Sequence, residues 1–436
     1  MDRFLTHTFS ITDHPIMKLD VRFKSQYVLG LGEFLSYIAY DDERVKLLFE
    51  VWCSSILGEI PDKVWHFAQG WPHIKEALRI KRAGFSFFTM RHPFIFDCFY
   101  LLESAHSELI HKAYIFLSNE IGGFFTKRII MDIYHYFKGE SEDIHVAETL
   151  KKHRELNRTF HKKPLKRVLV VATMSAGKST LINAITGFRL NRVKTTACTS
   201  KLCYIYNKPY QDGIVINTGE NKFVYSTDTE FSNSDSFTSA ALHFNSSLSK
   251  ENICFIDTPG SNYSNDSTHG EITHEAIQSN DYDMVLFVAN SQYFAAEDEN
   301  KLLDFTIEHA RKPIIFVLNQ LDRFKQREDS IKKMFEDFER ILREKRISQP
   351  VIAPLSAQGA LLIKQAQKLD EDQVYELEKL TAKFSNEYYF LERFYKQNEY
   401  IPEAILNHTG IFQLENLIIK CNETDQNQVQ SVFNIY

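Results

Sequence analysis

Residues 172 to 180, ATMSAGKST, directly follow the aliphatic run 168 to 171 and end with a lysine and two hydroxyl side chains. A buried strand, a loop and a helix N-terminus in this order surround a polyphosphate with backbone N–H groups. Lys178 is then expected to reach the β- and γ-phosphates, and Ser179 is expected to bind Mg²⁺ through its hydroxyl. The segment therefore predicts a phosphate-binding loop.

The loop departs from the usual pattern at its first position, where Ala172 replaces a glycine. A methyl group is accommodated there if the turn does not require a positive φ, so phosphate binding is expected to survive. Gly177 is needed because a side chain there would obstruct the phosphates, and Thr180 is placed to touch the α-phosphate. The predicted nucleotide contacts of the loop are Met174, Ser175, Ala176, Gly177, Lys178, Ser179 and Thr180.

A second motif, DTPGSN, follows the apolar run NICFI and begins at Asp257. An acidic residue at the end of such a strand can hold Mg²⁺ through water, and the Gly260 N–H can sense a γ-phosphate. The alternative is an ordinary turn. The position of DTPGSN directly after a strand favours the nucleotide-binding interpretation.

Two further motifs predict selection of the base. Asn319, Gln320 and Asp322 follow the strand-like run PIIFVL, and a carboxylate at this place accepts hydrogen bonds from N1–H and the exocyclic amine of guanine. Adenine offers no such pair of donors, so Asp322 is expected to select GTP. Ser356 and Ala357 follow a fourth run, where a backbone N–H can contact the guanine carbonyl oxygen.

The elements that must position these residues are predicted by hydrophobic patterns. From Lys166 onward, six short β-rich runs alternate with helical patterns, which indicates a mainly parallel sheet wrapped by helices. Residues 1 to about 150 show helical spacing with few glycines and prolines. The predicted fold is therefore an α/β P-loop domain preceded by an all-α N-terminal region.

Three further segments carry predictions, and the first two leave alternatives open. The aromatic segment 85–102 is interpreted first as a buried helix, and second as a membrane or partner surface. The basic stretch 151–167 is interpreted as a solvated helix and linker, with a phosphate or lipid patch as the alternative. The polar region 225–250 is predicted to be a mobile insertion.

Composition excludes several classes of function. A net charge of −6 gives no general attraction to nucleic acid, so no nucleic-acid partner is expected. The six cysteines are scattered without zinc-ligand spacing, which favours reduced thiols in the cytoplasm. The sequence contains no secretory signal peptide and no apolar run long enough to span a membrane, and a peripheral membrane location stays open.

The motifs SAGKST, DTPGSN…EITHEAI, NQLD and SAQGA…HTGIFQLENLI resemble the bacterial dynamin-like GTPases, within the Ras-like P-loop superfamily. The likeness covers about residues 160 to 420. It implies an N-terminal helical region over 1–160 and a dynamin-type GTPase domain over 161–436, with a helical insertion at about 361–405 and a short C-terminal tail. It also implies a homodimer formed through the GTPase domain.

The resemblance assigns further roles. Thr199 matches the first switch threonine, with Thr195 and Thr196 as rivals, so the Mg²⁺ set is Ser179, Thr199 and Asp257. Ser175 matches the family serine that helps to hold a monovalent cation near the transition state. The implied catalytic residues are Ser175, Lys178, Thr199 and Gly260.

The departures from the family pattern concern catalysis. Met174 stands where dynamins carry the glutamine that holds the hydrolytic water, and Ser261 stands where many Ras-like enzymes place theirs. Gln320 replaces the lysine that packs against the base. About sixteen residues follow residue 420, where dynamins have a long helical stalk. The sequence therefore predicts intact GTP binding and slow hydrolysis, and a GTP-dependent scaffold for a protein partner is the alternative.

Overall fold

The computed structural model describes residues 5–8, 13–58, 64–80, 90–106, 108–121, 123–190, 201–218, 223–226, 237–259, 267–293, 296–395 and 404–423. The chain divides into two compact units. The helical unit contains Met1–Lys162, Lys208–Asp228 and Ala240–Leu242, and the α/β unit contains Lys163–Asn207, Thr229–Ser239 and His243–Tyr436. Strand β5 (Ser239–Leu242) is divided between them.

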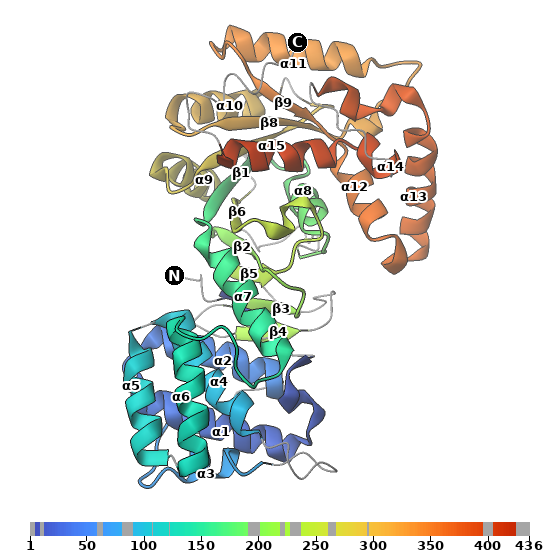
Figure 1. Ribbon diagram of the computed structural model, residues 1–436. Coiled ribbons are helices and arrows are strands. Elements are labelled where there is room, and N and C mark those ends of the chain that lie inside the picture. Colours follow the sequence, from blue (N-terminus) through green and yellow to red (C-terminus); the bar gives the residue numbers. More distant parts are fainter. Residues whose placement is uncertain are drawn as a thin grey trace. The chain divides into compact units, whose positions relative to one another are not determined.

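The helical unit is built mainly from α-helices (Figure 1), which bury many aromatic side chains. Its helices are η3 (Pro15–Lys18), α1 (Val21–Ile38), α2 (Glu43–Leu57), α3 (Pro72–Ala77), α4 (Arg91–Ala105), α5 (Leu109–Phe116), η4 (Leu117–Ile121), α6 (Phe124–Lys138) and α7 (Glu148–Lys162). Phe94 and Phe99 of α4 are fully buried, and Phe94 packs edge-to-face on Tyr27 of α1. The buried-helix interpretation of 85–102 is therefore confirmed for residues 90–102, and residues 85–89 lie outside the described part.

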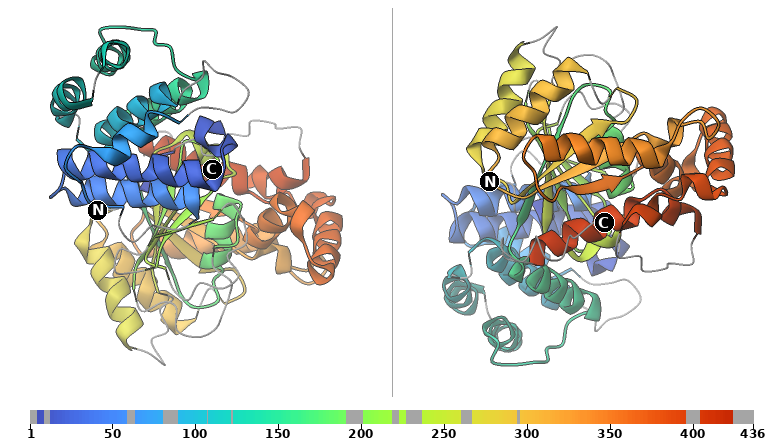
Figure 2. Two further views of the ribbon diagram at one scale, coloured as in Figure 1. Left: turned by 90° about the horizontal axis from the view of Figure 1, so that it is seen from below. Right: turned by 90° about the horizontal axis from the view of Figure 1, so that it is seen from above.

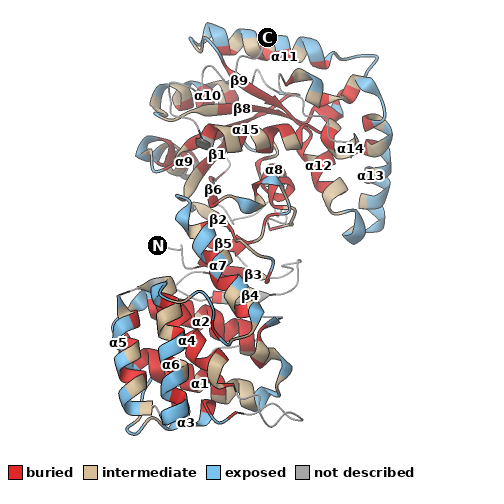
Figure 3. Cartoon of the chain, in the orientation of Figure 1, coloured by how far each residue is buried: buried red, intermediate tan, exposed pale blue. Residues whose placement is uncertain are grey.

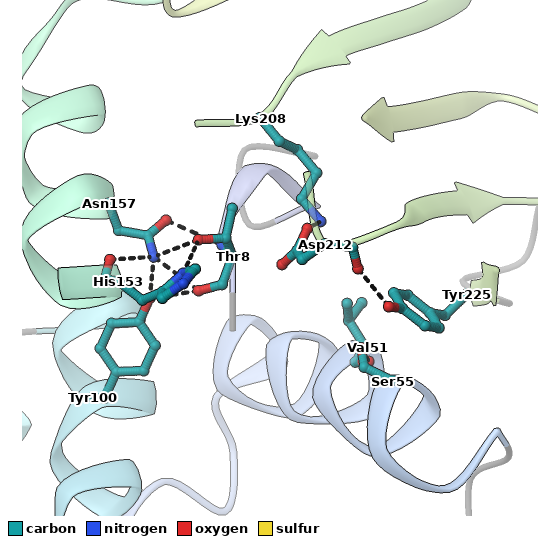
Figure 4. Close-up of polar contacts among 9 residues, drawn as sticks. All are labelled: Thr8, Val51, Ser55, Tyr100, His153, Asn157, Lys208, Asp212 and Tyr225. Atoms are coloured by element: carbon teal, nitrogen blue, oxygen red, sulfur yellow. Dashed lines mark hydrogen bonds and ion pairs between the residues drawn. The ribbon is translucent and has the colours of Figure 1, made fainter. Parts of the chain in front are cut away.

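The basic stretch is largely α7, and several of its polar side chains are buried within the helical unit. Asn157 donates to the Thr8 carbonyl at 2.9 Å and accepts from the Thr8 N–H at 3.1 Å (Figure 4). Burial lowers the pKa of the neighbouring His153 to about 4. Arg154 forms a two-pronged ion pair with Glu103 at 2.6 and 2.8 Å. These contacts give α7 a packing role that a solvated helix does not have.

A small antiparallel pair, β3 (Ile214–Asn217) and β4 (Phe223–Ser226), belongs to the same unit, and β4 packs against α2. Lys208 and Asp212 form a buried ion pair at 2.5 Å just before β3. The Tyr225 hydroxyl donates to the Asp212 carbonyl (Figure 4), and burial raises the pKa of Tyr225 to about 12. Sequence patterns did not predict these short strands.

The α/β unit contains the six strands that the sequence predicts. They are β1 (Lys166–Ala172), β2 (Cys203–Asn207), β6 (Ile253–Asp257), β7 (Met284–Asn290), β8 (Ile314–Asn319) and β9 (Val351–Pro354), in the order β2-β6-β1-β7-β8-β9. All neighbouring pairs are parallel except β2 with β6. Every residue of β6 and β7 is buried, as expected for strands covered on both faces.

Helices flank this sheet on both sides. They are α8 (Lys178–Thr186), η5 (Ser247–Lys250), α9 (Ser267–Ser279), α10 (Glu297–His309), η6 (Leu321–Arg323), α11 (Ile331–Glu344), α12 (Ala357–Lys364), η7 (Ala366–Lys368), α13 (Glu371–Phe384), η8 (Glu387–Tyr389), η9 (Leu391–Phe394), α14 (Ala404–His408) and α15 (Ile411–Glu423). Figures 1 and 2 show α9 and α10 together on one side and α12, α13 and α14 together on the other.

Two sequence predictions can be compared with these elements. The polar region 225–250 is not simply an insertion, because it contains β5 and η5, and Ala240, Ala241 and Leu242 are fully buried. Small apolar residues between polar runs gave too weak a signal for a strand. Within the described residues, no helix is long and apolar enough to cross a membrane.

Candidate nucleotide-binding site

The phosphate-binding loop lies between β1 and α8, at the carboxyl edge of the sheet. Parallel pairing aligns Val170 with Asp257 on one side of β1, and Ala172 with Val288 on the other. The strand ends from which the motifs begin therefore converge on this edge, where α/β folds bind ligands. Ala172 is fully buried at the end of β1 and does not have a positive φ, so a methyl group is accommodated at this position.

The loop takes a left-handed conformation at two residues, with φ of 64° at Ser175 and 88° at Gly177. A Cβ atom at Gly177 would lie 2.4 Å from the Asn319 amide nitrogen. Only glycine fits this position, both because of the positive φ and because of the close approach. Gly177 is also the N-cap of α8, so the first N–H groups of that helix are free of any side-chain cap.

Three side-chain amides hold the two carbonyl groups that precede Gly177. Asn319 donates to the Ala176 carbonyl at 2.9 Å, and Gln320 donates to the Ser175 carbonyl at 2.6 Å. Asn290, at the end of β7, donates to the same Ser175 carbonyl at 3.3 Å. With its carbonyls held by these amides, the loop is fixed in the conformation that a phosphate cradle requires.

Asn319 also connects the loop to the fourth motif, because its side-chain oxygen accepts from the Ala357 N–H at 3.0 Å. Ser356 caps α12 by accepting from the Gly359 N–H at 3.1 Å, and its hydroxyl donates to the Asp322 carboxylate at 2.6 Å. Lys383 of α13 donates to the Asp322 backbone carbonyl at 2.6 Å. The predicted guanine-selecting residues therefore form one hydrogen-bonded group.

A cavity of about 220 Å³ lies beside this group. It is lined by Gly177, Thr180, Asn319, Gln320, Asp322, Arg323, Gln358 and Glu376. The first five are predicted nucleotide contacts, whereas sequence reasoning missed Arg323, Gln358 and Glu376. The amide group of Gln320, where the family pattern has a lysine, is turned to the loop, and its oxygen is buried with no partner among the described residues.

Lys178 and Asp257 meet in the phosphate region. The Lys178 ammonium group contacts the Asp257 carboxylate, and each side chain is only 7% exposed. Thr258 fixes the strand end beside them by donating to the Val170 carbonyl at 2.8 Å. The contact brings together the residues predicted for the phosphates and for Mg²⁺.

For the remaining predicted residues, the structure gives only their exposure or does not describe them. Ser179 and Thr180 lie half-buried in the first turn of α8. Met174 is 54% exposed at the tip of the loop, beside the exposed Ser175. Thr195, Thr196, Thr199, Gly260 and Ser261 lie outside the described residues, so their predicted switch roles stay predictions.

One titratable residue near the loop was also missed by sequence reasoning. Glu299, in the first turn of α10, accepts from the Asn290 N–H at 2.8 Å and is 3% exposed. Burial raises its pKa to about 7, although the hydrogen bond from Asn290 acts in the opposite direction. Glu299 therefore supports the strand end that supplies one of the three loop-holding amides. The only feature of the sequence that could have indicated a role for Asn290 is its position at the end of a strand.

The geometry agrees with the comparison to protein families. Residues 168–321 match the model of the dynamin family. The α/β unit thus contains a dynamin-like GTPase domain, a class of enzyme that binds and hydrolyses GTP. A comparison with curated protein sequences gives no match.

Solved structures give more distant likenesses. The bacterial dynamin GTPase LeoA from ETEC is 14% identical with a TM-score of 0.35, covering 66% of this chain and 41% of LeoA. A GDP·AlF₄⁻-bound Era variant from Aquifex aeolicus is 18% identical with a TM-score of 0.27, covering 49% of this chain and 56% of Era. The G domain of FeoB from T. maritima is 18% identical with a TM-score of 0.24, covering 49% of this chain and 99% of that domain. With TM-scores below 0.5, these likenesses support no functional argument.

Proposed function

We propose that the chain is a Mg²⁺-dependent conformational switch that binds GTP tightly and hydrolyses it slowly. The observation that carries this proposal is the hydrogen-bonded group that links the phosphate-binding loop, through Asn319, to Asp322 and Ser356. One end of this group suits a triphosphate, and the other presents a carboxylate to a base. Such a group recognises a guanine nucleotide as one unit.

In this proposal Lys178 binds the β- and γ-phosphates, and Mg²⁺ is held by Ser179, Asp257 and Thr199. Lys178 and Asp257 already lie in contact near the loop, which supports their assignment to one phosphate–metal site. Bound Mg²⁺ would neutralise charge that develops on the phosphate oxygens. The N–H of Gly260 and the segment around Thr199 would respond to the presence of the γ-phosphate.

Slow hydrolysis is proposed because the exposed loop tip offers no side chain suited to positioning water. Met174 has a thioether, which is a weak hydrogen-bond acceptor, and it is 54% exposed. Ser175 beside it is also exposed, and by family resemblance it would hold a monovalent cation. An exposed tip is accessible to a second GTPase domain, so we propose that a homodimer formed across the nucleotide raises the rate. The switch would then act at a membrane surface or on a protein partner.

The second candidate function is a GTP-dependent scaffold with little or no hydrolysis, and Met174 is the observation that favours it. Phosphate release measured over a range of protein concentrations, with and without lipid vesicles, separates the two. The switch predicts slow turnover per molecule that rises with protein concentration. No release under any condition supports the scaffold, and fast release that does not depend on concentration contradicts both.

The division into a helical region ending near residue 160 and a GTPase domain stays a prediction.

A further inference from the structure

The first two turns of α6 carry large apolar side chains on their exposed face. Phe124 is 83% exposed and Phe125 is 76% exposed, and their rings lie edge-to-face with centroids 5.6 Å apart. Two turns into the helix, Met131 is 43% exposed. By contrast, most of α4 in the same unit is buried (Figure 3). Adjacent apolar side chains that are exposed to water mark surfaces that bind a protein, a membrane or a ligand.

The start of this exposed face carries two cations, and the exposed Asp132 lies one turn beyond them. Lys127 and Arg128 are both exposed, and the first turn of α6 contains no acidic side chain. Within the part of the chain that the structure describes, neither cation forms an ion pair. Phe124, Arg128 and Met131 follow the i, i+4, i+7 spacing that places side chains on one face of a helix. We call Phe124, Phe125, Lys127, Arg128 and Met131 the α6 tip.

A second group of aromatic side chains lies close to the chain segment that enters the α6 tip. Tyr37, Phe67 and Trp71 contact one another, with ring centroids 4.7 to 6.1 Å apart. The Trp71 indole N–H lies 3.5 Å from a carboxylate oxygen of Glu120, four residues before α6 begins. Figure 1 shows α3 and the start of α6 at the same end of the helical unit. Tyrosine and tryptophan favour the boundary between apolar and aqueous surroundings.

We propose that the α6 tip inserts into the surface of an anionic lipid bilayer. Phe124 and Phe125 enter the boundary between headgroups and acyl chains, while Lys127 and Arg128 contact lipid phosphates. The side chains of the tip select this occupant, because anionic headgroups attract the exposed cations Lys127 and Arg128 while the acyl boundary accepts the exposed rings beside them. A second copy of so acidic a chain gives no comparable attraction. The inference rests on the membrane-linked form of the proposed function and specifies its binding surface.

The test is co-sedimentation of the full chain, without nucleotide, with vesicles of phosphatidylcholine alone or of equimolar phosphatidylcholine and phosphatidylglycerol. The wild-type chain is expected to bind the anionic vesicles at least tenfold more strongly. The double substitution F124S/F125S is expected to lower that binding at least tenfold, because the two rings supply the apolar contact. The double substitution K127Q/R128Q is expected to lower it by up to about 30-fold, since each cation near an anionic surface contributes about fivefold.

A matched control lies on α13, where Val374 and Tyr375 are 41% and 59% exposed on a helix whose first turn is acidic and where Lys379 lies over the Tyr375 ring. The V374S/Y375S variant is expected to bind vesicles as the wild type does. Wild-type levels of binding by F124S/F125S, or no preference of the wild type for anionic vesicles, would overturn the inference. So would wild-type self-association without vesicles that F124S/F125S abolishes, because the tip would then join two copies. Calorimetry with GTP on the same variants shows separately whether nucleotide binding is intact.

Discussion

The nucleotide-binding site and the α6 tip depart from the usual distribution of side chains in opposite ways. At the site, polar groups are buried: Asn319 is 2% exposed and Asp322 is 8% exposed. At the tip, two phenylalanines are almost fully exposed. Burying a polar group and exposing an aromatic ring to water both cost free energy. We attribute both features of this chain to the binding of a ligand. The environment of a residue, more than its type, therefore marks a functional surface.

The largest expected effect contrasts a buried with an exposed phenylalanine in the helical unit. Phe94→Ala leaves a cavity between α4 and Tyr27, and should lower the free energy of unfolding by about 3–5 kcal/mol. Phe124→Ala removes an exposed ring and should change it by less than about 0.5 kcal/mol. Urea unfolding followed by circular dichroism measures both. Equal effects of the two substitutions would contradict the assigned burial.

The next effect concerns selection of the base. Asp322→Ala removes the carboxylate that would accept two hydrogen bonds from guanine, each about 1.5–3 kcal/mol for a charged partner. The affinity for GTP is therefore expected to fall more than about 100-fold, as measured by calorimetry. Asp337→Ala, at an exposed position of α11 paired with Arg340, is the matched control and should leave the affinity unchanged. An unchanged affinity of the Asp322 variant would exclude this residue from base recognition.

The buried Glu299 predicts a pH dependence. Its pKa is raised from 4.5 to about 7, so the folded protein holds this proton more tightly than the unfolded chain does. The contribution to stability is fully present below about pH 4.5, falls as pH rises toward 7, and then levels off. The total loss is roughly 3 kcal/mol.

Glu299→Gln keeps the oxygen that accepts from the Asn290 N–H but cannot ionise. The variant should therefore gain stability relative to the wild type as pH rises from 5 to 8. Urea unfolding at these two pH values measures the relative gain. The same pH dependence in both proteins would show that Glu299 does not cause it.

The smallest expected effect is that of Gln320→Lys. A lysine ammonium group can still donate to the Ser175 carbonyl, and the substitution removes the buried amide oxygen that has no partner within the described residues. The affinity for GTP should rise by no more than about threefold, or roughly 0.6 kcal/mol. A tenfold loss of affinity measured by calorimetry would instead show that Gln320 is adapted to this loop.

Sequence patterns predicted the six strands of the α/β unit and the nucleotide-binding loop, because buried strands and phosphate loops depend on local spacing. They did not predict Asn290, Glu299 or Lys383. Asn290 contacts the loop, Glu299 contacts Asn290 and Lys383 contacts Asp322, and all three contacts depend on how distant elements pack. The patterns predicted a buried helix within 85–102, with a surface as the second interpretation, and gave no signal for the α6 tip. The composition of 85–102 and of the α6 tip is similarly aromatic, and only packing shows that residues 90–102 are largely buried and Phe124 is exposed.

The measurement that tests the central claim most directly is a calorimetric titration of the full chain with GTP and with ATP, each in the presence of Mg²⁺. The bonding of Asn319 to both the loop and α12 predicts saturable binding of GTP, with ATP bound at least 100-fold more weakly. No heat with GTP, or equal affinity for the two nucleotides, would contradict the account.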